Sequence, residues 1–93
     1  MPETVRRRLL LYGAVQGVGF RYWAVREAAA YDVRGYVRNL GDGSVEAVIE
    51  GPRAEVERFA ETLKQGPPYG RVSRIKVVEE SPRGEFTSFE VRF

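Results

Sequence analysis

A loop with three glycines lies between a segment with the pattern of a strand and a segment with the pattern of a helix. It runs from Gly13 to Arg21 and reads Gly-Ala-Val-Gln-Gly-Val-Gly-Phe-Arg. Glycine adopts backbone angles that other residues resist, so the chain can turn tightly and direct its amides inward. The following helix adds N–H groups and the positive end of its dipole, and Arg21 adds a planar fork of charged donors. The stretch predicts an anion site, most simply a phosphate site.

The periodicity of apolar residues on either side of this loop predicts five strands and two helices. Strands are expected at residues 5–12, 33–39, 44–50, 72–79 and 87–93, and helices at about 20–30 and from Pro52 to about 65. The Asp42-Gly43 pair predicts a hairpin between the second and third strands. This order is typical of an α+β, ferredoxin-like split β-α-β sandwich, with an antiparallel four- to five-stranded sheet and both helices on one face. Ninety-three residues predict one domain, 1–93.

One face of each predicted element is apolar and is expected to be buried. The expected core positions of the first and fourth strands are Val5, Leu9, Leu11, Ile75 and Val77. The aromatic residues expected in the core are Phe20, Trp23, Tyr31 and Phe93. The terminal carboxylate of Phe93 could also reach Arg21 and hold it in place.

The composition excludes several kinds of chemistry. The chain has no cysteine and no histidine, so it has no disulfide, no thiolate nucleophile or thiolate metal site, and no imidazole base. Its net charge of +2, from 15 basic and 13 acidic residues, is too even to indicate a nucleic-acid partner. No stretch resembles a signal peptide or a membrane span. We therefore expect a cytoplasmic protein without a membrane partner, and a monomer, because nothing requires an oligomer.

Two motifs in register resemble the signatures of the acylphosphatase family. The first is Gly13-Ala14-Val15-Gln16-Gly17-Val18-Gly19-Phe20-Arg21-Tyr22, and the second is Gly35-Tyr36-Val37-Arg38-Asn39 followed by Asp42-Gly43-Ser44-Val45-Glu46. The spacing of the motifs, the order of elements and the chain length fit as well, so the resemblance covers essentially the whole chain. It implies a cytoplasmic enzyme that hydrolyses the carboxyl-phosphate bond of acyl phosphates without a metal or cofactor.

The resemblance also implies roles for particular residues. Arg21 would be the catalytic arginine that grips the phosphate, and Asn39 would orient the attacking water. The backbone amides that would cradle the phosphate are those of Gln16, Gly17, Val18, Gly19, Phe20 and Arg21. Two positions depart from the family pattern: Ala14, where many members carry Arg, and Tyr12, where many carry another residue, often His. Both leave open whether a second cation tunes substrate choice.

The residues present suit this reaction. The carboxylate of an acyl phosphate leaves readily, so the remaining needs are positioning and stabilisation of charge on the phosphoryl group. Asn39 can accept from a water and donate to it, but it is not a base at neutral pH. The loop from Gly13 to Arg21 contains no Ser, Thr, Cys, His or Asp, which favours direct attack by water over a phosphoenzyme.

Other interpretations remain open at this stage. Taken singly, a glycine turn before a helix is usually only a turn, Arg21 is a common kind of surface residue, and Asn39 suits a hairpin. A non-catalytic anion- or RNA-binding module is the main alternative, because Arg34-Gly35-Tyr36 matches the start of the RNA-recognition strand signature. That match fails at Val37 and Arg38. A regulatory or carbamoyl-phosphate-processing domain cut from a larger protein is a third reading, against which the chain length argues.

Overall fold

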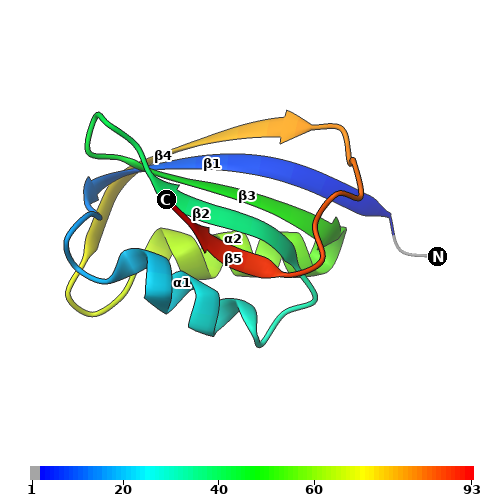
Figure 1. Ribbon diagram of the computed structural model, residues 1–93, viewed down its shortest axis with the longest axis horizontal. Coiled ribbons are helices and arrows are strands. Elements are labelled where there is room, and N and C mark those ends of the chain that lie inside the picture. The colour runs from blue at the N-terminus through cyan, green and yellow to red at the C-terminus, as the bar shows by residue number, and fades with distance from the viewer. Residues whose placement is uncertain (1–2) are drawn as a thin grey trace.

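The computed structural model describes residues 3–93, which form five strands and two helices (Figure 1). The elements are β1 (Thr4–Ala14), α1 (Phe20–Ala28), β2 (Arg34–Asn39), β3 (Val45–Pro52), α2 (Arg53–Gln65), β4 (Arg71–Glu80) and β5 (Phe89–Arg92). Every expected element is present, with ends displaced by a few residues. Pro52 precedes α2 as its N-cap instead of being its first residue. Among the described residues, neither helix is long and apolar enough to span a membrane.

The strands form a single sheet in the order β4-β1-β3-β2-β5, and both helices cover the same face of it (Figure 1). Four strands pair antiparallel as predicted, but β5 runs parallel to β2, from Gly35↔Phe89 to Arg38↔Arg92. The expectation of a wholly antiparallel sheet is therefore wrong at this edge. The cause is the connection 81–88, which begins where β4 ends and enters β5 from that same end of the sheet. The sheet is mixed, within the predicted α+β ferredoxin-like fold.

The core lies between the sheet and the two helices. Val5, Leu9 and Leu11 of β1 are buried as expected, as is Phe20 at the start of α1. The partly buried residues that pack against this core include Val18, Trp23, Tyr31, Val72 and Ile75.

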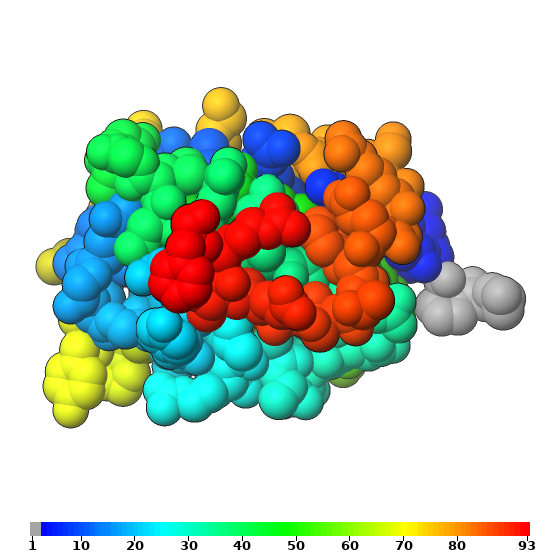
Figure 2. Space-filling model, viewed as in Figure 1, coloured from blue at the N-terminus to red at the C-terminus, as the bar shows by residue number. Residues whose placement is uncertain are grey.

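Two residues expected in the core lie outside it. The side chain of Val77 is 47% exposed, because β4 is an edge strand and Val77 lies beside Arg7 and the charged side of α2. Phe93 is 90% exposed, because β5 ends at Arg92 and the last residue leaves the sheet. Figure 2 shows the C-terminal residues, coloured red, on the surface of the molecule.

Charged residues occupy the face of the sheet that the helices leave open. Arg6 is buried there, and its guanidinium lies 2.8 Å from Glu80, 2.7 Å from Glu85 and 3.4 Å from Glu50. The carboxylate of Glu50 also accepts hydrogen bonds from the backbone N–H groups of residues 83 and 84. This cluster fastens the connection 81–88 to the sheet. The hydrogen bond from Arg6 is the main reason that the pKa of Glu80 lies below its usual value.

Candidate active site

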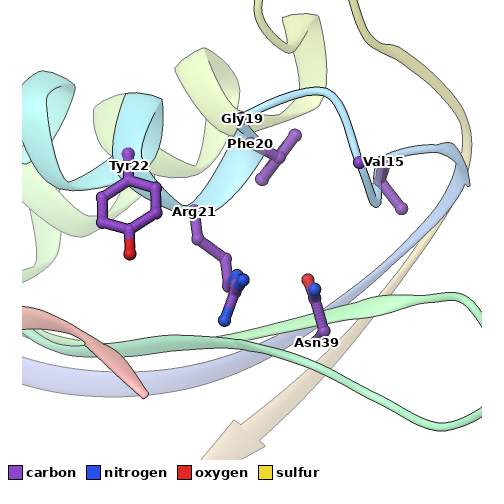
Figure 3. Close-up of a pocket in the computed structure, with 7 residues that line it drawn as sticks. Val15, Gly19, Phe20, Arg21, Tyr22 and Asn39 are labelled. Atoms are coloured by element: carbon purple, nitrogen blue, oxygen red, sulfur yellow. The ribbon is translucent and has the colours of Figure 1, made fainter. Parts of the chain in front are cut away.

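A cavity of about 180 Å³ lies where the glycine loop, the first turn of α1 and the end of β2 meet (Figure 3). The residues that line it are Val15, Gly17, Gly19, Phe20, Arg21, Tyr22 and Asn39. Two of the predicted site residues, Arg21 and Asn39, come from separate elements and face this one space. β1 leads into the loop: its pairing with β4 shifts register at Tyr12/Gly13 and continues to Ala14↔Arg71, and the chain leaves the sheet at Val15.

The backbone of the loop alternates between conformations of opposite sign. Gly17 and Gly19 have φ values of +76° and +75°, whereas Gln16 and Val18 have negative φ, as do all other non-glycine residues from 3 to 93. Alternation of this kind turns successive N–H groups toward one concave side, which binds anions. A Cβ atom added to either glycine would have no neighbour within 4 Å. The left-handed backbone angle, and not crowding, is therefore what requires glycine here.

The N-terminus of α1 extends this set of N–H groups. Gly19 is the N-cap, and the first helical hydrogen bond runs from the N–H of Trp23 to the carbonyl of Gly19, 3.0 Å. No side chain caps this end, and its first turn holds no acidic residue, whereas the first turn of α2 carries Glu55. The first N–H groups of α1 have no partner within the helix, and no carboxylate offsets its positive end. An anion is the natural ligand for such an end.

Arg21 is half-buried and extends from α1 toward the cavity (Figure 3). None of the ion pairs among residues 3–93 involves it. Its guanidinium carbon lies 5.0 Å from the ring centre of Phe93, a cation–π distance. The C-terminal residue thus touches Arg21 as suggested, but through its aromatic ring, with no ion pair to the terminal carboxylate. The charge of Arg21 is left available to a ligand.

Asn39 is the last residue of β2 and pairs with Val45 across the hairpin. Its half-buried side chain faces the cavity opposite Arg21 (Figure 3). The hairpin is the one that the Asp42-Gly43 pair predicts. It is closed by a hydrogen bond from the N–H of Leu40 to the carbonyl of Ser44, 2.9 Å. The carboxylate of Asp42 accepts from the hydroxyl and the N–H of Ser44, which lowers the pKa of Asp42.

Gln16 and Val18 are the predicted cradle residues that do not line the cavity. The side chain of Val18 packs toward the core, and that of Gln16 turns to the hairpin. The amide nitrogen of Gln16 donates to the carbonyls of Leu40, at 2.7 Å, and of Ser44, at 2.8 Å. The sequence does not indicate these bonds, because no local pattern connects a loop residue with a hairpin 24 positions away.

Two further residues line the cavity without having been predicted. Tyr22 is 58% exposed at the mouth of the cavity, and its place next to Arg21 in the first turn of α1 was the available signal. Val15 is fully buried and forms part of the wall. No group of three or more His, Cys, Asp or Glu residues in the described part of the chain is arranged to hold a metal ion.

The chain matches known proteins over nearly its whole length. A family model described as acylphosphatase matches residues 7–91. An acylphosphatase from Moorella thermoacetica is 51% identical, over 97% of this chain and 96% of that protein. The crystal structure of acylphosphatase from Bacillus subtilis superposes with a TM-score of 0.90 and 36% identity, covering 96% of this chain and 99% of that one. The crystal structure of T. kodakarensis HypF matches with a TM-score of 0.79 and 40% identity, covering 94% of this chain but 12% of that longer chain.

Proposed function

The chain belongs to the acylphosphatase family, and we propose that the cavity between its glycine loop and Asn39 is where the acyl phosphate reacts. The protein hydrolyses the carboxyl-phosphate bond of acyl phosphates, which gives a carboxylate and inorganic phosphate. Convergence of Arg21 and Asn39 on one cavity beside an uncapped helix N-terminus is the observation that carries the site assignment.

In this proposal the loop and Arg21 bind the phosphoryl group. The backbone N–H groups from Gln16 to Arg21 donate to its oxygens, and the guanidinium of Arg21 binds them with a permanent charge. Both are in place before the reaction, so they stabilise the transferring phosphoryl group without rearrangement. The alternating φ values of the loop support this assignment, as does the fact that Arg21 forms no ion pair with any of residues 3–93.

Asn39 orients the water that attacks the phosphorus. Its carboxamide can accept one hydrogen bond from the water and donate another to it, which fixes the water without removing its proton. The bond that forms is between the water oxygen and phosphorus, and the bond that breaks joins phosphorus to the carboxylate oxygen. The carboxylate leaves as an anion, and the proton passes to a phosphate oxygen or to solvent. No covalent intermediate on the protein is needed.

This mechanism predicts the shape of the pH–rate profile. Because no side chain acts as the base, no side-chain titration should control kcat for benzoyl phosphate near neutral pH. The pH–rate profile should therefore show no inflection there that is caused by a residue of the protein. A steep inflection that disappears on replacing a titratable residue, such as Tyr22 by Phe, would contradict water activation without an enzymic base.

The direct test of the proposed function is hydrolysis of benzoyl phosphate by the purified protein with a chelator present. We expect turnover that excess chelator does not reduce, since the proposed site uses N–H groups, a guanidinium and a carboxamide. Absence of hydrolysis, or its loss on chelation, would contradict the proposal. Inhibition by inorganic phosphate is expected, since the product occupies the same cradle.

We further propose that the protein acts as a single-domain, cytoplasmic monomer without a nucleic-acid or membrane partner. The proposed mechanism uses the loop N–H groups, Arg21 and Asn39, and needs no group from a second copy of the chain. The RNA-binding alternative is not favoured, because it needs Tyr36 free to stack on a base. Arg92 lies over that ring at 3.9 Å, and Phe86 packs against it with a ring-centre distance of 5.9 Å.

A further inference from the structure

The side chain of Gln16 joins the two halves of the cavity. One half is the glycine loop with the start of α1, and the other is the β2–β3 hairpin that carries Asn39. The two bonds from Gln16 to the carbonyls of Leu40 and Ser44 are the only hydrogen bonds between residues 15–19 and residues 39–45 in the described part of the chain.

The two acceptors of Gln16 lie next to the pair formed by Asn39 and Val45, both on its turn side and one on each arm of the hairpin. Leu40 directly follows Asn39, and Ser44 directly precedes Val45. Both carbonyls also accept backbone hydrogen bonds within the turn. The carbonyl of Ser44 accepts from the N–H of Leu40, and the carbonyl of Leu40 accepts from the N–H of Gly43. Gln16 therefore holds both strands of the hairpin at the position of Asn39, and both of its N–H groups are used for this.

We propose that the side chain of Gln16 is a positioning residue, which sets the distance between the carboxamide of Asn39 and the phosphate bound by the loop. This rests on the proposed function, in which Asn39 orients the water. The backbone N–H of Gln16 donates to the phosphate, while its side chain holds the hairpin whose Asn39 orients the water. Because reaction rates depend steeply on the placement of the attacking group, a small displacement of the hairpin slows the chemical step more than it weakens phosphate binding.

The test replaces Gln16 by Leu, which keeps the size of the side chain and the backbone N–H but removes both donors. The matched control is Gln65→Leu, the same change at an exposed position at the end of α2. We expect Gln16→Leu to lower kcat for benzoyl phosphate by roughly 10- to 100-fold. The inhibition constant of inorganic phosphate should change far less, and Gln65→Leu should behave as the unaltered protein.

A double-mutant cycle with Asn39→Ala shows whether Gln16 acts through Asn39. If it does, adding Gln16→Leu to Asn39→Ala causes little further loss of kcat. The same fold-loss in both backgrounds, or full activity of a folded Gln16→Leu variant, would overturn the inference. Should Asn39→Ala itself keep the original kcat, the water-orienting role in the proposed function fails instead.

A second measurement uses the unaltered protein and does not depend on the folding of any variant. Both side-chain N–H protons of Gln16 should exchange with solvent much more slowly than those of exposed Gln65, as followed by NMR. Equal exchange at the two residues would show that Gln16 does not hold the hairpin, and would overturn the inference.

Discussion

Arg21 brings the only guanidinium among the residues that line the cavity. Among residues 3–93 its side chain forms no hydrogen bond or ion pair and stacks on the ring of Phe93, so its N–H groups are free to donate to phosphate. A charge-assisted hydrogen bond contributes about 1.5–3 kcal/mol, and a contact that strengthens in the transition state contributes more. Arg21 should therefore matter for both binding and turnover.

We expect Arg21→Ala to lower kcat/KM for benzoyl phosphate by at least about 10- to 100-fold and to weaken inhibition by inorganic phosphate. Arg26→Ala, in the last turn of the same helix, is the control for loss of a positive charge and should have little effect on either quantity. Steady-state kinetics with phosphate as inhibitor measures both. Comparable losses in the two variants would mean that net charge, and not a contact in the cavity, accounts for the effect.

The sequence predicts the two main cavity residues better than it predicts the residues that hold them in place. Arg21 and Asn39 are found by their motifs, and the structure brings both to one cavity. The side-chain role of Gln16 and the stacking of Phe93 on Arg21 depend on residues far apart in the chain. Such contacts follow from the tertiary fold, so no periodicity or spacing in the sequence indicates them.

Among the elements, the loop and the first turn of α1 form the part of the site that needs particular backbone angles. Gly19 is both a left-handed glycine of the loop and the N-cap of the helix. A side chain at this position would meet open space, so the effect of a substitution comes from the backbone.

We predict that Gly19→Ala lowers the free energy of unfolding by about 1–2 kcal/mol, the cost of a left-handed angle for a residue with a Cβ. Binding of inorganic phosphate should weaken as well, because relief of this strain turns N–H groups out of the cradle. Gly41→Ala is the control: it also meets open space, but without a positive φ, and should be close to neutral. Chemical denaturation and phosphate inhibition check both variants, and equal effects would contradict a conformational role for Gly19.

The positions of helices, strands and turns can be predicted where a short stretch of sequence determines them. The helix and strand positions follow from local periodicity, and the hairpin follows from Asp42-Gly43. The direction of β5 depends on where the connection 81–88 crosses the sheet, which involves the cluster around Arg6 and Glu50. The exposure of Val77 depends on β4 being an edge strand. Neither property is local, which is why both expectations were wrong.

The molecule as a whole is a helix layer on one face of a sheet and a charged cluster on the other. Glu80 belongs to this cluster and binds both Arg6, at 2.8 Å, and Arg8, at 2.9 Å. Its pKa is lowered in the folded protein, chiefly by the hydrogen bond from Arg6. A carboxyl with a lowered folded pKa stabilises the fold above its unfolded pKa, about 4.3, and this stabilisation is lost as the pH falls through the folded pKa.

We therefore expect the free energy of unfolding to decrease on acidification below about pH 4.3, with Glu80 as one contributor. Glu80→Gln should be less stable than the unaltered protein at pH 7 and should lose less stability between pH 7 and pH 3. Glu61→Gln, at an exposed ion pair on α2, is the control and should retain the original pH dependence. Denaturant titrations at several pH values provide the comparison; an unchanged slope in Glu80→Gln would refute the assignment.

In the proposed mechanism the loop and Arg21 hold the phosphate while Asn39 orients the water. The most direct measurement is kcat for benzoyl phosphate together with the inhibition constant of inorganic phosphate in Asn39→Ala. We expect kcat to fall by roughly 100-fold, because the water is no longer held in place, while phosphate affinity stays nearly unchanged. Equal loss of turnover and of phosphate affinity would contradict it, since Asn39 would then be part of the phosphate cradle.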